Sequence, residues 1–283
     1  MHQNLVYDIG MNNGDDTAYY LRCGHRVLAV EANPLLAQSV SRRFHREIAE
    51  GRLQILNVGI SHDGASLPFW VCDDHSEWSS FDRAIAGRDG AAHHAIEVRC
   101  CRFRDILVAH GTPWYLKIDI EGNDVLCLRD LQRTQLPEYL SVEANGVDIL
   151  AQMHALGYDS FQCISQFHLV PLENPPHPQH AWLERRRRWA ADSSVGWRLL
   201  RMFGVSYWLR RSAKRLRYRD DWFFRHGTSG PFGSKLPGRW MSYQDMRQTY
   251  QHYEAARARG ESSIFWRDGG YSFWSDFHAR RSG

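Results

Sequence analysis

The sequence predicts an α/β fold built on a largely parallel sheet. Two observations point to it. Short apolar runs rich in β-branched residues alternate with helix-like segments over residues 1–164, and a Gly/Asn turn joins the first run to the first helical segment. Strands that are joined by crossover helices produce this alternation, and such strands pair in parallel.

The elements follow one another in a regular order. Strands are expected at residues 4–9, 26–32, 53–60, 114–120, 139–144 and 158–164. Helices are expected at residues 15–21, from Pro34 to about residue 49, from the acids after Ile120 to about residue 131, and at 147–156. Two further strands, 67–72 and 96–103, bracket a polar loop at 73–94 for which the sequence predicts no structure.

The alternation stops after residue 164. Residues 165–270 are rich in Pro, Arg and Trp, with helix-like stretches at 197–216 and 243–259. An aromatic run at 271–278 is expected to form the last strand. The sequence therefore predicts one domain made of residues 1–164 and 271–283, interrupted by an insertion at 165–270.

Composition excludes several classes of protein. No apolar run reaches the roughly 20 residues needed to cross a bilayer, and no hydrophobic signal segment follows Met1, so we expect a cytoplasmic protein. The six cysteines form no CxxC pair and no spacing with His that suits zinc. They are expected to be reduced, mostly buried thiols.

The most informative motif lies at the first strand-to-helix turn. Asp8, Gly10, Asn12 and Gly14 occupy this turn, and Glu31 ends the next strand. Glycines let the backbone approach a bound nucleoside, and an acid about 20 residues further on can accept hydrogen bonds from ribose hydroxyls. The spacing predicts a Rossmann-like nucleoside site.

Two cofactors fit such a site. A dinucleotide requires G-x-G-x-x-G and a helix N-terminus without competing carboxylates for its pyrophosphate. Here Asn12 replaces the middle glycine, and Asp15 and Asp16 begin the helix, where they repel phosphate but suit an ammonium and a sulfonium. These residues favour S-adenosylmethionine.

Three segments then carry a resemblance. They read VYDIGMNNGDDTAYYL, VLAVEANP and YLKIDIEGNDVLCL, and in this order they resemble the FkbM family of S-adenosylmethionine-dependent methyltransferases over roughly residues 5–144. The later pieces SGPFGSKLPGRW and FWSDFHAR resemble the C-terminal part of some members. Residues 167–228 show no resemblance.

The resemblance implies a Rossmann-like class I methyltransferase fold. Its mostly parallel sheet has seven strands with the last antiparallel, and in this chain the long insertion would lie between the last two strands. It also implies methyl transfer to oxygen, commonly on sugars or secondary metabolites. The residues assigned in this way are Asp8, Gly10, Asn12 and Gly14 on the methionine and ribose side, Glu31 at the ribose hydroxyls, and Asn57 near the adenine or, alternatively, as the cap of a turn.

Methyl transfer to a hydroxyl requires alignment, a route for the proton and exclusion of water. Asp119 and Glu121 end one predicted strand and Glu143 and Asn145 the next, so their side chains are expected to meet over the methyl group. Asp119 would then orient the ammonium of the donor, and Glu121 or Glu143 would handle the proton. Two alternatives stay open: Asp119, Glu143 and Asn145 hold Mg²⁺, or Lys117 pairs with one of the acids and the others cap helices.

Histidines are alternative bases near neutral pH. His75, His93 and His94 lie in or beside the loop at 73–94, and His168 follows the sixth strand of the alternating series. His278 ends a strand that is expected to be antiparallel, so a structural role is expected for it.

Basic charge is concentrated in the insertion. Residues 185–219 hold twelve Lys or Arg and one acid, Asp192, although the net charge of the chain is only +3. With the surrounding tryptophans, this segment is interpreted as a lid over the site, as a binding surface for an anionic substrate or an anionic membrane, or as a solvated helix face. Arg interleaved with aromatics also suits single-stranded nucleic acid, the least favoured partner.

Together these observations predict an O-methyltransferase that acts on a hydroxyl of a sugar, glycan or small metabolite. N-methylation is the alternative within the same class. The alternative from another class is a nucleoside-fold module that binds nucleic acid or an anionic membrane through residues 185–219 without turnover.

Overall fold

The computed structural model describes residues 2–178, 180, 182, 222–225, 227–261, 263, 265–266 and 274–281. It divides into two compact units, of which unit 1 comprises Met1–Asp159 and His278–Gly283, and unit 2 comprises Ser160–Phe277. The basic segment 185–219, the helix expected at 197–216 and residues 271–273 of the expected last strand lie outside the described residues.

Five parallel strands form the sheet of unit 1. In spatial order they are β9 (Tyr139–Glu143), β8 (Pro113–Ile118), β1 (His2–Ile9), β2 (Arg26–Val30) and β3 (Leu53–Leu56). Tyr7, Leu116 and Leu140 at the centre of this sheet are completely buried. Burial on both faces explains why these strands read as near-continuous apolar runs in the sequence.

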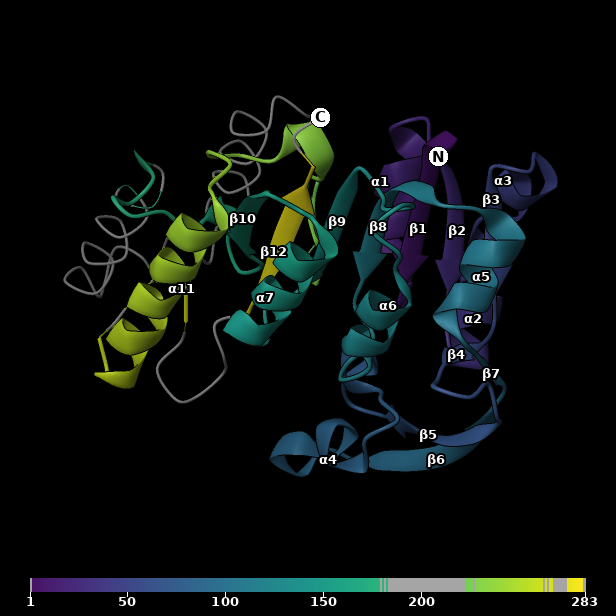
Figure 1. Cartoon of the computed structure of the whole chain (residues 1–283). Helices are drawn as coiled ribbons and strands as arrows, with labels where there is room; N and C mark the ends of the chain where they lie inside the picture. Colours follow the sequence, from purple (N-terminus) through teal and green to yellow (C-terminus); the bar gives the residue numbers. More distant parts are fainter. Residues whose placement is uncertain are drawn as a thin grey trace, which may run out of the picture. The chain divides into compact units, whose positions relative to one another are not determined.

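The strand order changes direction beside β1. From β1 the chain moves outwards to β2 and β3, returns to β8 on the other side of β1, and continues to β9. The helices α5 (Phe103–His110), α6 (Asp124–Asp130) and α7 (Val147–Leu156) lie in front of the sheet in Figure 1. Right-handed crossovers place the helices that join β1, β2 and β3 on the opposite face: α1 (Asp15–Arg22), α2 (Pro34–Arg43) and α3 (His45–Ala49). Open α/β sheets bind ligands at such a reversal, outside the C-terminal ends of the strands.

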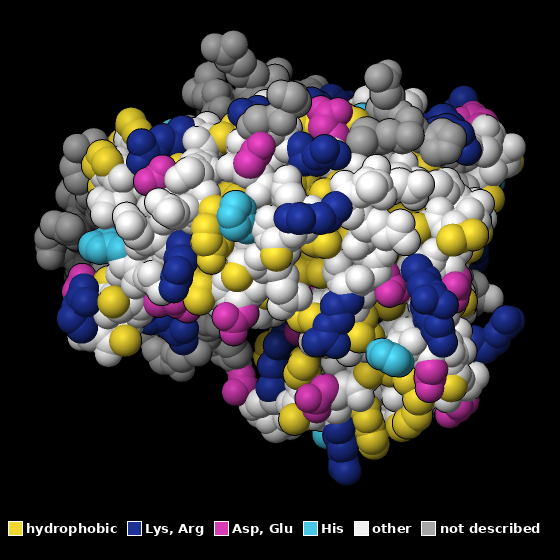
Figure 2. Space-filling view, in the orientation of Figure 1, with side chains coloured by type: hydrophobic (Ala, Val, Ile, Leu, Met, Phe, Trp, Pro, Cys, Tyr) yellow, Lys and Arg dark blue, Asp and Glu magenta, His cyan; other side chains and the backbone are white. Residues whose placement is uncertain are grey.

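A projecting segment, residues 61–101, lies beyond the C-terminal ends of these strands in Figure 1. We call it the arm. Its frame is an antiparallel hairpin, and β4 and β7 pair in parallel at its base. On the face shown in Figure 2, basic, acidic and hydrophobic side chains are intermixed over the arm rather than sorted into patches. The elements of the arm and its base are β4 (Gly59–Ile60), β5 (Leu67–Cys72), the 3-10 turn η1 (Ser76–Trp78), α4 (Arg83–Ala86), the 3-10 turn η2 (Arg88–Gly90), β6 (His93–Val98) and β7 (Cys100–Cys101).

Unit 2 begins with β10 (Ser160–Ser165), which pairs antiparallel with the two-residue strand β11 (Val170–Pro171). It also contains η3 (Gly233–Lys235) and α11 (Tyr243–Ala258), the latter close to the helix expected at 243–259. The last strand, β12 (Ser275–Arg280), starts in unit 2 and ends in unit 1. The Asp159 N–H donates to the Arg280 carbonyl and the Gln166 N–H to the Trp274 carbonyl, which is the antiparallel arrangement expected of the last strand.

The structure corrects three expected elements. The strand expected at 53–60 is two strands, because β3 pairs with β2 whereas β4 pairs with β7. The strand expected at 96–103 ends earlier, since Phe103 already begins α5. The single helix expected from Pro34 is interrupted at Phe44, whose φ of −111° and ψ of 30° are not helical.

The strand count also differs from the seven implied by the family resemblance. Among the described residues the largest sheet has eight strands, which are β1, β2, β3, β8, β9, β10, β11 and β12. The additional one is β11, which lies in a Pro-containing stretch that gives no strand signal. Across the described residues, no helix combines the length and the apolar character that crossing a membrane requires.

Candidate active site

The loop after β1 is pressed against the loop after β8. Gly10 has a φ of +87°, and the backbone N–H groups of Gly10 and Met11 both donate to the Val30 carbonyl. A Cβ atom on Gly10 would lie 1.8 Å from the carbonyl oxygen of Asp119. Only glycine therefore allows these two loops to meet at the point where the strand order reverses.

Glu31 follows β2 and is fixed by the backbone on both sides. Its Oε2 accepts the Asn12 N–H and its Oε1 accepts the Asn33 N–H, each at 2.8 Å. The residue is 7% exposed, and burial raises the pKa of its carboxyl to about 7, although both backbone hydrogen bonds act to lower it. Each carboxylate oxygen keeps a second acceptor direction, so Glu31 can still bind two hydroxyl groups.

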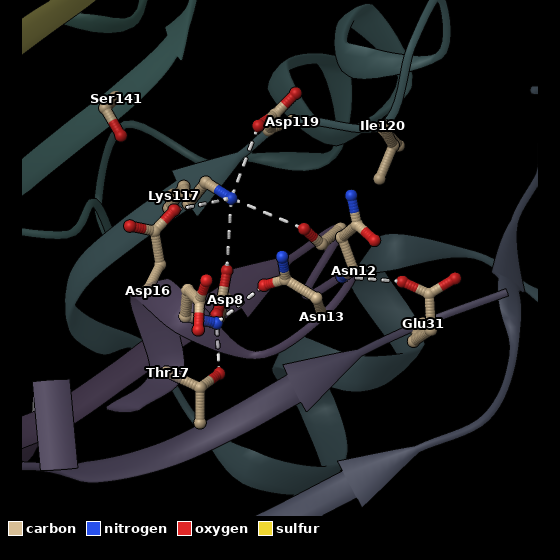
Figure 3. Close-up of polar contacts among 12 residues, drawn as sticks. Asp8, Asn12, Asn13, Asp16, Thr17, Glu31, Lys117, Asp119, Ile120 and Ser141 are labelled. Atoms are coloured by element: carbon tan, nitrogen blue, oxygen red, sulfur yellow. Dashed lines mark hydrogen bonds and ion pairs between the residues drawn. The ribbon is translucent and has the colours of Figure 1, made fainter. Parts of the chain in front are cut away.

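Lys117 is the central cation of the site (Figure 3). Its Nζ lies 3.4 Å from Asp8 Oδ1, 3.3 Å from Asp16 Oδ2 and 3.3 Å from Asp119 Oδ2. It also donates to the Gly10 carbonyl at 3.3 Å. Sequence analysis considered a pair with one acid, whereas the structure shows Lys117 joining three carboxylates from three different elements.

Glu121 lies in a charged contact with the arm. The two terminal nitrogens of Arg88 each donate to one oxygen of Glu121 at 3.2 Å. Burial and the neighbouring Asp119 raise the pKa of Glu121 to about 7, and Arg88 acts in the opposite direction.

Two further acids lie near Glu121. Burial raises the pKa of Glu143 well above its ordinary value, with Glu121 and Asp119 contributing in the same direction. Burial also raises the pKa of Asp124 to about 6, although this side chain accepts the Ile120 N–H. Asp119 and Glu121 follow β8 and Glu143 ends β9, and these two strands pair in parallel. That their side chains meet over the methyl group stays a prediction.

These loops line a cleft. One part of its wall is apolar and includes Ile60, Phe69 and Phe81, with the two phenylalanine rings edge to face at 5.0 Å. The cleft thus combines an apolar wall with carboxylates. The lining residues are Gly10, Asn12, Val30, Glu31, Ala32, Ile60, Phe69, Ser76, Glu77, Ser79, Phe81, Asp119, Ile120 and Glu121.

The residues predicted from the sequence fall into two groups. Gly10, Asn12, Glu31, Asp119 and Glu121 line the cleft. The others surround or support it and are not among its lining residues. These are Asp8, Gly14, Asn57, Glu143 and Asn145. Asp8 is completely buried and accepts a hydrogen bond from the Thr17 hydroxyl at 2.6 Å, and Gly14 packs against Val40.

Asn57 holds the ends of two neighbouring strands together. Its Nδ2 donates to the Glu31 carbonyl at 2.8 Å and to the Ala32 carbonyl at 3.2 Å. This contact is structural but is not the cap of a turn that the sequence considered, and the adenine contact stays a prediction.

The magnesium hypothesis gains no support from the geometry. Asn145 donates its amide Nδ2 to Glu143 Oε2 at 2.8 Å, so its nitrogen rather than its oxygen faces that carboxylate. Within the described part of the chain, no three or more His, Cys, Asp or Glu side chains are grouped so that they could hold a metal ion. Mg²⁺ at Asp119, Glu143 and Asn145 therefore stays a prediction.

The candidate histidines are engaged elsewhere. The His75 ring lies 4.1 Å from the Trp78 ring, His93 Nε2 accepts from Arg83, and His94 Nδ1 lies 2.9 Å from Asp73. Burial lowers the pKa of His278 to about 3, so this ring stays neutral at physiological pH. The residues that line the cleft include no histidine.

Sequence analysis missed the contribution of the arm. Ser76, Phe69 and Phe81 reach the cleft from this segment, and the Ser76 hydroxyl donates to Asn12 Oδ1 at 2.9 Å. Single serines and aromatics in a polar loop form no recognisable spacing. The signal available was only the position of the loop, after the third strand of a nucleoside fold.

A cleft of this kind, at the strand reversal of a Rossmann-like sheet and with an acid beyond β2, is what a class I methyltransferase fold offers its methyl donor. The methyltransferase FkbM domain matches residues 8–160, more than half of the chain, and the chain belongs to this family. The match confirms the resemblance seen in the three motifs. The protein is accordingly an S-adenosylmethionine-dependent methyltransferase.

Two further comparisons add little. Among solved structures, precorrin-6y C5,15-methyltransferase from Geobacter metallireducens GS-15 is 12% identical, with 58% of this chain and 68% of that chain covered and a TM-score of 0.32. This similarity is too distant to carry an argument. No curated protein matches the chain significantly.

Proposed function

We propose that the cleft binds S-adenosylmethionine and that the enzyme transfers its methyl group to a hydroxyl of a sugar, glycan or small metabolite. The observation that carries this proposal is Glu31, a buried carboxylate that lines the cleft beside the glycine loop. The oxygen acceptor is proposed from membership of the FkbM family.

The residues of the cleft fit this cofactor. Glu31 has acceptor directions left for the two ribose hydroxyls, and Ile60, Phe69 and Phe81 offer an apolar surface for the adenine. Asp119, with a side chain that is 43% exposed, is placed to accept from the ammonium. When bound, S-adenosylmethionine supplies an electrophilic methyl group on a positively charged sulfur, which carboxylates near the cleft stabilise.

The chain itself must align the acceptor and receive its proton. Alignment of held reactants can lower a barrier by roughly 7 to 11 kcal/mol, so positioning is expected to contribute most. Glu121 lines the cleft and is the carboxylate best placed to take the hydroxyl proton. We also propose that the insertion at 165–270 binds the acceptor, with the Arg-rich segment 185–219 as its contact to an anionic acceptor or membrane surface.

Calorimetry on the full chain tests the cofactor. S-adenosylhomocysteine and S-adenosylmethionine are expected to bind, and NAD is not. Failure of both sulfur compounds to bind would overturn the proposal, whether or not NAD binds.

Substitution of Glu31 tests the observation that carries it. Glu31→Gln replaces one charged acceptor by an NH₂ group that faces a backbone N–H, so we expect affinity for S-adenosylhomocysteine to fall at least about tenfold, equivalent to about 1.4 kcal/mol. Glu97→Gln is the matched control, because Glu97 is exposed on β6 and does not line the cleft. Unchanged affinity in Glu31→Gln would show that the ribose is bound elsewhere.

A further inference from the structure

The arm makes three separate contacts with a turn that follows β8 and consists of Glu121 and Gly122. Ser80 Oγ donates to the Glu121 carbonyl at 2.7 Å, and Arg88 donates two hydrogen bonds to the Glu121 carboxylate. A Cβ atom on Gly122 would lie 2.9 Å from Ile85 Cδ1, so this side chain packs directly on the glycine. All three contacts come from one short stretch of the arm, residues 80–88.

Arg88 is itself held in a defined position. Its guanidinium carbon lies 4.4 Å from the centre of the Trp78 ring, and the guanidinium plane presents a fork to the carboxylate. Bidentate pairing with a carboxylate is a geometry that Arg provides and Lys cannot reproduce, and Arg also stacks on aromatic rings more often than Lys does. The side chain of Glu121 is 16% exposed, so the pair is only partly open to solvent.

The position of Glu121 makes this pair more than a surface ion pair. Glu121 lines the cleft, and the turn that carries it is strained, with a φ of +44° at Glu121 and +102° at Gly122. The groups that face its carboxylate are Asp119 from the end of β8, Asp124 from α6, Glu143 from β9 and Arg88 from the arm. Three of these four groups are acids, and Arg88 is the cation among them.

We propose that Arg88 is a positioning residue that directs the Glu121 carboxylate at the cleft, so that Glu121 can act as the base for the acceptor. This inference rests on the proposed function. The acceptor oxygen forms a bond to the methyl carbon, the bond from that carbon to sulfur breaks, and its electron pair stays on sulfur. The hydroxyl proton passes to Glu121 and then to solvent, so charge and atoms balance.

The neighbouring acids are less suited to this task. Asp119 is paired with Lys117 at 3.3 Å. Glu143 does not line the cleft.

The test is a carboxyl titration of the full chain labelled with ¹³C at glutamate Cδ, in which Glu121→Gln assigns the Glu121 signal. We expect Arg88→Met to raise the titration midpoint of Glu121 by at least about one pH unit, and Arg88→Lys to raise it less, because a charge without the fork remains. Arg83→Met is the control, since Arg83 also lies on the arm and stacks on a tryptophan, Trp70, without contacting Glu121.

The outcomes separate the two proposals. An unchanged midpoint in Arg88→Met, with or without a lower melting temperature, overturns the inference and leaves the pair as a structural link between arm and turn. Binding of S-adenosylhomocysteine reports on folding of each variant and is expected to stay within about threefold of the unaltered chain. If the unaltered chain fails to bind it, the proposed function falls, while the titration still decides whether Arg88 controls Glu121.

Discussion

The acids at the start of α1 are neutralised more completely than their sequence suggests. Arg43 pairs with Asp15 at 3.0 Å, and Lys117 pairs with Asp16. In addition, Asn13 Oδ1 accepts the Asp15 N–H, which occupies one of the donors that a pyrophosphate would use. The occupied Asp15 N–H is therefore a structural reason against a dinucleotide, whereas the paired acids repel phosphate less than their sequence suggests.

Gly10 provides a prediction at the scale of one residue. Gly10→Ala places a Cβ atom against the Asp119 carbonyl and forces a left-handed backbone on alanine, so we expect the free energy of unfolding to fall by more than about 2 kcal/mol. Urea unfolding of the full chain measures the loss. Binding of S-adenosylhomocysteine is expected to fall with it, because the loop must move.

Gly24→Ala is the matched control for this prediction. Gly24 has a φ of +86°, close to that of Gly10, but nothing lies within 4 Å of its Cβ position. The loss in free energy of unfolding in Gly24→Ala therefore reports only the cost of a left-handed backbone on alanine, which is about 1 kcal/mol. Equal losses in the two variants would show that the contact between the two loops is not tight.

At the scale of elements, the sequence predicts the buried part of unit 1 well. The strands from β1 to β10 that form the α/β pattern carry long apolar runs. The helices between them begin at recognisable residues, such as Asn33 before Pro34, and the Asn33 side chain accepts the Leu35 N–H. The run from Leu53 to Ile60 misleads because its hydrophobicity continues across Asn57. In the structure β3 pairs with β2 and β4 pairs with β7, and Asn57 between them donates to the carbonyls of Glu31 and Ala32.

The candidate site was predictable for the same reason, and only in part. Gly10, Glu31 and Asp119 follow strands that the sequence identifies, so their convergence follows from topology. The arm contributes Phe69, Ser76 and Phe81 through tertiary contacts over distances that no local pattern encodes. Arg88 belongs to this second group, since its partner is 33 residues away in the sequence.

Asn57 gives a prediction about how strand ends are held. Asn57→Ala removes two hydrogen bonds from the junction of β2 and β3, and we expect the free energy of unfolding to fall by about 1 to 2 kcal/mol. Asn4→Ala is the control, because Asn4 donates one exposed hydrogen bond to the Gly24 carbonyl. If the adenine contact considered from the sequence is real, affinity for S-adenosylhomocysteine falls about tenfold or more in Asn57→Ala, whereas a structural role leaves it within about threefold.

For the whole of unit 1, the dominant electrostatic feature is an excess of buried carboxylates. Glu31, Glu121, Asp124 and Glu143 all have raised pKa values, and burial is the largest cause in each case. Structural ion pairs usually lower the pKa of an acid. The raised values mean that ionisation of these carboxyl groups destabilises the fold. A positively charged cofactor would relieve that cost, which links stability to binding.

The direction of the pH dependence follows from these values. An acid with a folded pKa of about 7 and an ordinary value of 4.5, such as Glu31 or Glu121, binds more protons in the folded chain than in the unfolded chain between those values. Its stabilising contribution is complete below pH 4.5 and is lost as the pH rises through 7. We expect the free energy of opening of unit 1 to decrease between pH 5 and pH 8, by on the order of 3 kcal/mol if one such acid dominates.

Hydrogen exchange of peptides from β1, β8 and β9, corrected for the intrinsic rate at each pH, measures this free energy. Glu31→Gln cannot ionise at this position, so its profile should be flatter than that of the unaltered chain even though its absolute stability is lower. Saturating S-adenosylmethionine should also flatten the profile, because its positive charge favours the ionised carboxylates. Protection that stays constant or rises from pH 5 to pH 8 would mean that these acids are ionised at little cost, and that the cleft does not depend on a cationic ligand to balance them.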